Sequence, residues 1–408
     1  MSVFQYITLL IVSVTLIGVA IGRYPVLRMN RATIVLVGSA LLIFINAISF
    51  DQALSSIDLN TITLLFCMMI INVNLRICGF FDLITQKVIR IARTPSQLLI
   101  LVIFSSGILS ALFLNDTIVL VYTPLVLEIT SLLGLNPIPY LIATACAANV
   151  GSAATIIGNP QNMLIGISSG ISFLDFTLNL APVALGALLF VWLVVSIVYR
   201  KQINNKKFFV EPEIKIKLYF PLFYKSMIAA VIMIILLLLD YPIPLSALVA
   251  SSILLVTRRL KPERVFREID WGLLVFFSGL FVVTASIDTS KIGSHLFSLI
   301  LPLLQSDFAT FSIISAVVSN IVSNVPAVLL FKPVVPLMQN ANTLWLLLAV
   351  STTFAGNLTL LGSVANLIVA ESAKSRGVKL SFKEYLKAGI PVTVLTLLFS
   401  VIWFTLFF

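Results

Sequence analysis

The sequence predicts an all-α polytopic membrane protein built as an inverted repeat, because three observations agree. Of the 408 residues, 60% are hydrophobic and 10% are charged, whereas soluble domains carry roughly 25% charged residues. Apolar runs of about 20 residues, the length that crosses a bilayer as a helix, follow one another along the chain, and the mean hydropathy is +1.12. Two polar motifs of the first half recur in the same order in the second half.

Each half is expected to contain five crossings, one of them a broken transmembrane helix, and one re-entrant helical hairpin. The first half, residues 1–200, has apolar runs at 4–22, 32–50, 59–80 and 178–200, a hairpin at about 95–133 and a broken helix at about 139–172. The second half, residues 221–408, has runs at 221–239, 244–257, 270–287 and 388–408, a hairpin at about 307–339 and a broken helix at about 343–373. The hairpin segments are too long for one helix and too short for two full crossings. Residues 201–220 form a polar linker between the halves.

Lys and Arg give the chain a net charge of +10 and cluster in short segments between the apolar runs. This is the positive-inside pattern of membrane proteins, so no nucleic acid partner is needed to explain the charge. We expect the chain to lie in the cell (inner or plasma) membrane with these clusters on the cytoplasmic side. Both termini then lie outside, and the central linker is cytoplasmic. Because each half has an odd number of crossings, the second half is inverted relative to the first, and the two hairpins enter from opposite faces.

Serine, asparagine and proline keep their spacing in the two predicted hairpins. The first hairpin has Ser110, Asn115 and Pro124, and the second has Ser319, Asn324 and Pro333. The segment 155–162 is likewise echoed by 359–366. An unsatisfied polar group in hydrocarbon costs several kcal/mol. The paired polar breaks therefore predict a site between the halves that holds a polar solute, as in secondary transporters.

The hairpin tips are candidate ion-binding elements, because broken helix ends leave backbone carbonyl and amide groups free. Their polar residues are Asn115, Asp116, Thr117, Ser323 and Asn324. An isolated carboxylate such as Asp116 at membrane depth must pair, bind a cation or stay protonated. We therefore expect it to carry the coupling ion, with Na⁺ held at Asn115, Asp116 and Asn324. The alternative is that Asp116 only caps a helix.

The two broken helices are candidate solute-binding loops. Glycine permits close approach and Pro160 begins a new half-helix, while amides and hydroxyls supply neutral donors and acceptors. The alternative is glycine-mediated helix packing. The candidate residues are Gly151, Ser152, Thr155, Gly158, Asn159, Gln161, Asn162, Gly356, Asn357, Thr359, Gly362, Ser363 and Asn366.

Two cations near the membrane segments have different interpretations. Lys332 in the second hairpin either attracts an anion, pairs with Asp116 as a charge partner, or extends to the outer interface, and the sequence leaves these alternatives open. Arg76, near the end of a crossing, is interpreted as an interfacial residue.

At the polar breaks the chain resembles the ion transporter superfamily, which includes arsenite permeases, citrate–metal symporters, divalent-anion/sodium symporters and a class of sodium/proton antiporters. Asn115-Asp116 with Pro124 resembles the hairpin tip of arsenite permeases. Gly158-Asn-Pro-Gln-Asn162 resembles the Gly-x-Pro-x-Asn break of the superfamily, in the form seen in uncharacterised anion permeases. The resemblance implies a scaffold, a carrier that slides in an elevator-like movement, and in many members a homodimer.

These observations predict a secondary active transporter that moves a small anion through the lipid bilayer, coupled to H⁺ or Na⁺. Alternatives in the same class are arsenite or antimonite efflux and Na⁺/H⁺ antiport, and an ion channel is the alternative from a different class. Phosphate-binding loops, metal-ligand clusters and nucleophile motifs are absent from the sequence, so we expect no enzyme activity, no metal and no cofactor other than the coupling ion.

Overall fold

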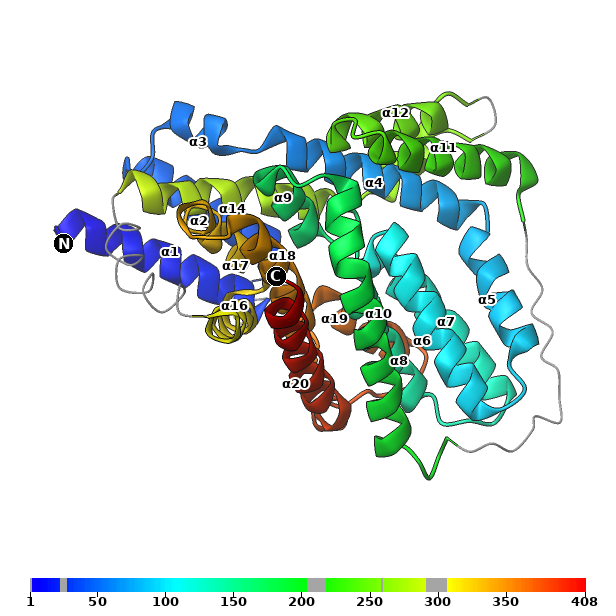
Figure 1. Cartoon of the computed structure of the whole chain (residues 1–408). Helices are drawn as coiled ribbons and strands as arrows, with labels where there is room; N and C mark the ends of the chain where they lie inside the picture. The colour runs from blue at the N-terminus through cyan, green and yellow to red at the C-terminus, as the bar shows by residue number, and fades with distance from the viewer. Residues whose placement is uncertain (1, 23–27, 204–217, 258–259, 291–306) are drawn as a thin grey trace.

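A computed structural model of the chain describes residues 2–22, 28–203, 218–257, 260–290 and 307–408. The described residues form helices and no strands (Figure 1), so the predicted all-α fold is confirmed. Most of the predicted linker, residues 204–217, lies outside the described residues.

The helices of the first half run in chain order with short connections. They are α1 (Val3–Ile21), α2 (Arg31–Phe44), α3 (Phe50–Ser56), α4 (Leu59–Ile77), α5 (Phe80–Ile91), α6 (Pro95–Leu112), α7 (Asn115–Leu132), α8 (Ile138–Ser152), α9 (Pro160–Ser169) and α10 (Phe173–Val198).

The described helices of the second half follow a similar order. They are α11 (Phe220–Leu238), α12 (Ile243–Leu255), α13 (Pro262–Arg267), α14 (Trp271–Thr289), α16 (Phe308–Val322), α17 (Asn324–Phe331), the 3₁₀ turn Val335–Leu337, α18 (Ala341–Ala355), α19 (Val364–Ser375) and α20 (Phe382–Phe407).

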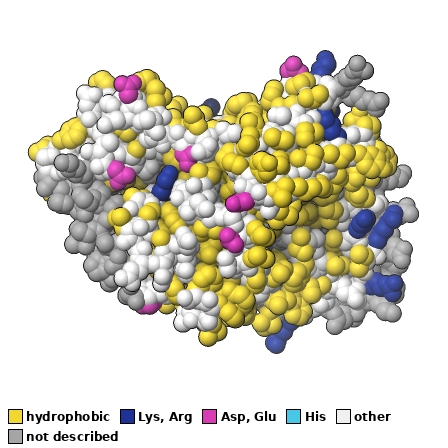
Figure 2. All heavy atoms as spheres, turned by 45° about the horizontal axis from the view of Figure 1, so that its top comes forward, with side chains coloured by type: hydrophobic (Ala, Val, Ile, Leu, Met, Phe, Trp, Pro, Cys, Tyr) yellow, Lys and Arg dark blue, Asp and Glu magenta, His cyan; other side chains and the backbone are white. Residues whose placement is uncertain are grey.

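Seven helices of the described residues are long and apolar enough to cross a membrane: α1, α4, α6, α10, α11, α14 and α20. Their outer faces are apolar, as at Leu189 on α10 and Leu398 on α20, which are 52% and 54% exposed. In Figure 2, hydrophobic side chains cover much of the visible face, and most of the visible Lys and Arg gather toward its right-hand edge. Such a surface is stable in a bilayer, where exposed apolar side chains contact lipid.

Two predicted crossings are shorter than a full span. The run 32–50 ends as a helix at Phe44, because Asn46 takes a left-handed conformation (φ 57°) and Ser49 then caps α3 by accepting from the Gln52 amide. The run 244–257 forms only the 13 residues of α12.

The helices pack in two groups. In the first, which we call the α4–α14 group, α2 packs against α14, α4 against α12, and α1 and α11 flank them. In the second, the broken-helix group, α6 packs against α8, α16 against α18, α7 against α19 and α10 against α20. The groups meet where α4 contacts α9, α14 contacts α17 and α1 contacts α16.

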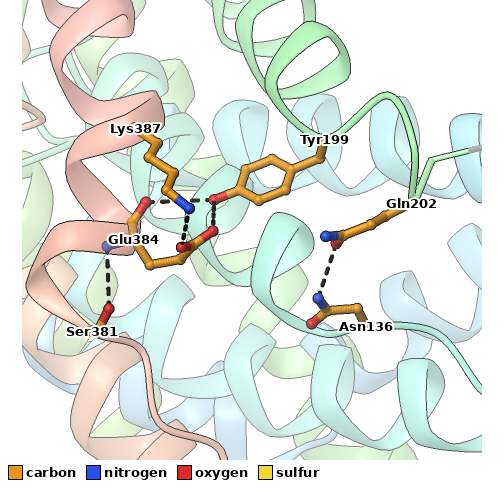
Figure 3. Close-up of polar contacts among 6 residues, drawn as sticks. All are labelled: Asn136, Tyr199, Gln202, Ser381, Glu384 and Lys387. Carbon is orange, nitrogen blue, oxygen red and sulfur yellow. Dashed lines mark hydrogen bonds and ion pairs between the residues drawn. The ribbon is translucent and has the colours of Figure 1, made fainter.

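The two longest helices, α10 and α20, lie side by side in the middle of the molecule (Figure 1). Figure 3 shows how their ends are joined. The Tyr199 hydroxyl donates to a Glu384 carboxylate oxygen at 3.0 Å, and Lys387 Nζ donates to the other oxygen at 2.6 Å. Since α10 closes the first half and α20 the second, these bonds link the two halves away from the polar breaks.

Candidate functional site

The first hairpin segment bends two residues earlier than its polar triplet. Phe113 is extended (φ −138°, ψ 164°) between α6 and α7, and Asn115 is the first residue of α7. The predicted break at Asn115, Asp116 and Thr117 is therefore wrong by about two residues, because the Asn115 N–H donates to the Gly158 carbonyl at 3.0 Å and begins the helix there. In the second hairpin the bend lies at Ser323, whose φ of 80° is a strained conformation for a residue with a side chain.

Each broken helix is closed by its own asparagine. Between α8 and α9, Asn162 Nδ2 donates to the carbonyls of Ser152, Ala153 and Thr155 at 3.2, 3.3 and 3.0 Å. Between α18 and α19, Asn366 Nδ2 donates to the carbonyls of Gly356 and Thr359 at 2.8 and 3.0 Å. With the spacing that aligns 155–162 with 359–366, the Ser152 and Thr155 carbonyls correspond to those of Gly356 and Thr359, so the two breaks share a hydrogen-bond pattern.

The half-helices after the breaks start in the same way. Asn159 caps α9 by accepting from the Asn162 amide at 2.8 Å, and Pro160 is the first residue of that helix. Ser363 caps α19 by accepting from the Ala365 amide at 3.2 Å. Side-chain oxygens at this position are favoured because they satisfy helix N–H groups that have no partner in the helix. Both breaks are therefore built by local sequence.

Asn149 joins the first hairpin to the second broken helix. Its Nδ2 donates to Asn357 Oδ1 at 2.9 Å and to Asn366 Oδ1 at 3.1 Å. Its Oδ1 accepts from Asn115 Nδ2 at 3.1 Å and from the Ser363 hydroxyl at 3.0 Å. Asn149 is 2% exposed, so this network, which we call the amide network, is sealed from solvent.

Thr353 occupies the corresponding place in the second half. Its hydroxyl oxygen accepts from Asn159 Nδ2 at 3.4 Å and from Gln161 Nε2 at 3.2 Å. The spacing that aligns Thr155 with Thr359 aligns Asn149 with Thr353 and Asn159 with Ser363. The contacts Asn149–Ser363 and Asn159–Thr353 are therefore equivalent pairs, and each connects the two halves.

Two glycines are required by close packing at the first break. A Cβ on Gly151 would lie 2.1 Å from the Gly107 carbonyl oxygen of α6, and a Cβ on Gly158 would lie 2.3 Å from the Ser152 carbonyl oxygen. Both distances are well below van der Waals contact, so only glycine fits. Gly151 therefore has the packing role that was the alternative to solute binding, because it lets α6 and α8 come into contact. Its neighbours make the polar contacts described above.

A cavity of about 170 Å³, which we call cavity 1, lies beside the amide network. Asp116 and Thr117 from the first turn of α7 line it, so these two predicted residues face open space while Asn115 points into the network. The first residues of two other helices also border it. The lining residues are Met69, Asn72, Val73, Arg76, Leu114, Asp116, Thr117, Leu120, Pro160, Glu268, Asp270, Leu273, Val364 and Ile368.

Cavity 1 is lined by more negatively charged than positively charged side chains. Arg76 forms an ion pair with Glu268, while Asp116 and Asp270 add two carboxylates. Asn72 on α4 is 1% exposed, and neither its amide nitrogen nor its amide oxygen has a hydrogen-bond partner. A buried, unpartnered amide is rare in folded proteins, and here it sits in the wall of a cavity where a bound solute can satisfy it.

Lys332 lies away from Asp116. It lines a second cavity of about 270 Å³, cavity 2, together with Asp288 of α14, and its Nζ lies 5.9 Å from the centroid of the Phe281 ring. The ion pairs found among the described residues are Arg76–Glu268 and Lys387–Glu384. The proposed pairing of Lys332 with Asp116 is therefore not formed in this structure.

Several predicted residues contact each other and others remain peripheral. Asn115, Asn357, Ser363 and Asn366 meet at Asn149, and Asn159 and Gln161 meet at Thr353. Asn324 Oδ1 instead accepts from the Ser319 hydroxyl at 2.8 Å, and Gly362 lies near Gly356 and Asn320. The predicted site residues did not include Asn149, Thr353 or Asn72. The available signal was their amide or hydroxyl group in helices that are otherwise apolar.

Comparison with known proteins agrees with these features. Residues 8–353 match the family described as citrate transporter. The chain is 29% identical to a 46 kDa membrane protein of Mycobacterium leprae over 94% of this chain and 96% of that one. It is 29% identical to a silicon efflux transporter of Oryza sativa subsp. japonica over 91% of each chain, and 25% identical to the arsB transporter of Dictyostelium discoideum over 98% of this chain and 92% of that one.

The fold resembles that of the YdaH transporter of Alcanivorax borkumensis, with a TM-score of 0.63 at 14% sequence identity, covering 98% of this chain and 97% of the other. The resemblance to transporters of the citrate and arsenite groups, which the polar breaks indicated, is thereby confirmed. The chain belongs to the citrate transporter family and is a multi-pass membrane transporter.

Proposed function

We propose that this transporter moves a small anion in a secondary active cycle driven by H⁺ or Na⁺. The observation that carries the proposal is the amide network, in which side chains from both halves meet at Asn149 without contact to solvent. The equivalent hydrogen bonds at the two breaks support an inverted repeat of residues 1–200 and 221–408. Inverted repeats that meet at interrupted helices place a solute near the middle of the membrane.

Cavity 1 provides the electrostatic environment for the anion. Three helices begin at its wall: α7 near Asp116, α9 at Pro160 and α19 at Val364. A helix N-terminus bears a partial positive charge and free N–H groups, both of which favour an anion. The Asn72 amide nitrogen offers a further donor.

Asp116 explains how a cation is coupled to the anion. An ionised carboxylate in the first turn of α7 repels an anion at the same helix N-terminus, and the repulsion is strong where water is scarce. Binding of H⁺ or Na⁺ to Asp116 removes that charge, so the anion binds after the cation. Among the described residues no three Asp, Glu, Cys or His side chains converge on a metal site, so Na⁺ would need neutral oxygens, such as the Thr117 hydroxyl, beside the Asp116 carboxylate.

The two helix groups suggest how the solute crosses. The broken-helix group contains the amide network and both hairpins, and it contacts the α4–α14 group where α4 meets α9 and α14 meets α17. Asn72 of α4 and Pro160 of α9 both line cavity 1. Movement of the broken-helix group along the α4–α14 group, in the elevator manner that the family resemblance implies, would expose the solute to each side in turn. In this proposal both termini lie outside, the central linker lies in the cytoplasm, and the α4–α14 group is the part that a homodimer would share.

The test is flux in proteoliposomes with Asp116→Asn. Sulfate, citrate, succinate and arsenite are each offered under imposed Na⁺ and pH gradients. We expect the variant, which carries a permanently neutral side chain, to keep exchange of the transported solute but to lose its dependence on the cation gradient. Asp175→Asn, which removes an exposed carboxylate that does not line cavity 1, serves as the matched control. Gradient-driven uptake that is unchanged in Asp116→Asn would contradict this role.

A second candidate function is the extrusion of an uncharged oxyacid, such as arsenite or silicic acid, in exchange for a cation. The carboxylates of cavity 1 favour it, since Asp116, Glu268 and Asp270 outnumber Arg76. The names of two relatives point the same way. Transport of arsenite and silicic acid with no transport of sulfate, citrate or succinate would support this candidate over the first. Steady single-channel currents would instead indicate an ion channel.

A further inference from the structure

Cavity 2 lies at the same place in the second half as cavity 1 does in the first. Helices α4 and α14 are both 19 residues long, and each is capped by an aspartate, Asp58 or Asp270. The spacing of 212 residues between these caps (from 58 to 270) aligns the two helices residue by residue. Cavity 2 is lined by Ser56, Phe281, Thr284, Ala285, Ile287, Asp288, Leu329, Leu330, Lys332 and Pro333.

The alignment maps one cavity onto the other. Met69, Asn72, Val73 and Arg76 line cavity 1 from α4, and the positions 212 residues later are Phe281, Thr284, Ala285 and Asp288, which line cavity 2 from α14. Ser56 of cavity 2 corresponds in the same way to Glu268 of cavity 1. None of these pairs is identical in residue type, so the correspondence comes from the fold and not from sequence similarity.

We propose that cavity 2 is a second chamber for the transported anion, opening on the opposite side of the membrane, in which Lys332 contacts the anion. The proposal rests on the proposed function and adds the residues of the other end of the path. Among the described residues, Asp288 of α14 is the other charged residue that lines this cavity.

The charge at one corresponding position is reversed, since Arg76 of α4 corresponds to Asp288 of α14, while cavity 1 holds two further carboxylates, Glu268 and Asp270, that have no charged counterpart in cavity 2. In cavity 1 the α7 hairpin contributes Asp116 and α4 contributes Arg76; in cavity 2 the α17 hairpin contributes Lys332 and α14 contributes Asp288. Within the described parts of the chain Lys332 makes no ion pair, since its nitrogen is more than 4.0 Å from any carboxylate oxygen, and it rests over the Phe281 ring. Its ammonium is thus open to an anion.

In this proposal the two cavities differ in their need for a coupling cation. At cavity 1 the anion meets a carboxylate and requires a cation to neutralise Asp116. At cavity 2 it meets an ammonium and requires none. The cation gradient is therefore needed on the side of cavity 1, and Lys332 sets the affinity on the side of cavity 2.

Sidedness is tested by cysteine labelling. Asn72→Cys and Thr284→Cys are made in a background in which the buried Cys67, Cys78 and Cys146 are replaced and flux is retained. A membrane-impermeant methanethiosulfonate reagent is applied from either side of sealed vesicles. We expect the two cysteines to react from opposite sides, while Val275→Cys, on the outer face of α14, does not react. Reaction of both from the same side, or of neither, would overturn the proposal.

The charge pair is tested by exchange. Lys332→Glu is expected to reduce anion flux by about tenfold or more, since a charge-assisted contact with the anion is replaced by repulsion. Asp288→Lys, which keeps Lys332 and removes a carboxylate from the lining, is expected to retain flux. The double variant restores opposite charges and is expected to recover most of the flux. A double variant no better than Lys332→Glu, or a Lys332→Glu variant with normal flux, would remove Lys332 from the path. If Asp116→Asn still loses gradient dependence in that case, the proposed function stands and only the role of cavity 2 fails.

Discussion

Replacing Asn149 by alanine should destabilise the protein more than the loss of any other polar side chain at the polar breaks. The substitution removes four hydrogen bonds, to Asn115, Asn357, Asn366 and Ser363. All four partners are buried, at 7% exposure or less, so water does not readily replace the lost contacts.

The expected size follows from the number of bonds. An interhelical side-chain hydrogen bond in a membrane protein contributes on average about 0.6 kcal/mol, and a buried bond in proteins generally about 1 kcal/mol. Loss of the four bonds of Asn149 should therefore lower the free energy of unfolding by between about 2.5 and 4 kcal/mol. Thr353→Val removes only the two longer bonds at the equivalent position, keeps the side-chain shape, and should cost about 1 kcal/mol.

The comparison is made by reversible unfolding in mixed micelles with increasing denaturing detergent, followed by tryptophan fluorescence. The two variants are matched because they lie at corresponding places in α8 and α18. A loss in Asn149→Ala that is below about 1 kcal/mol, or equal to the loss in Thr353→Val, would show that the amide network does not hold the halves together.

The other predictions concern binding and packing. Asn366→Ala and Asn324→Ala should both raise the KM for the transported solute in proteoliposome flux. Each variant loses a hydrogen bond that fixes an element of the proposed site, the second broken helix or the tip of the second hairpin. A normal KM in both would argue against a shared site. Gly151→Ala should give little monodisperse protein in size-exclusion chromatography, since its Cβ would meet the Gly107 carbonyl. Gly272→Ala, whose Cβ would lie 3.1 Å from the Asp270 side chain and near no other group of the described residues, should purify normally. Equal yields of the two variants would refute the packing argument.

The elements that local sequence controls were predictable. Pro160 and the capping side chains of Asn159 and Ser363 begin new helices through local interactions that do not depend on the rest of the fold. The apolar runs indicate membrane helices by composition alone. The end of α2 was missed because a single residue, Asn46, adopts a left-handed conformation inside an apolar run, and hydropathy is insensitive to such a change.

The long-range contacts of the site were not predictable from one sequence. Asn149 bonds to residues more than 200 positions away, and only the fold determines which amides meet. Asn72 was not predicted, because an asparagine in an apolar helix can equally well make a hydrogen bond in a packed contact between helices. Arg76 was interpreted as interfacial, and the structure places it in the wall of cavity 1 beside Glu268. Side-chain type indicated that polar groups would gather, but not which of them line the open space.

The position of Asp116 relative to the network bears on how coupling can work. Asn115 is held by Asn149 and by the Gly158 backbone, whereas its neighbour Asp116 faces cavity 1. A change of charge on Asp116 is therefore felt one residue away by the bonds that join the hairpin to both broken helices. A single carboxylate thus borders both the open space of cavity 1 and the network between the halves. In the proposed cycle, binding of a cation there would alter both the affinity for the anion and the fit of the two halves together, which is what coupled transport requires.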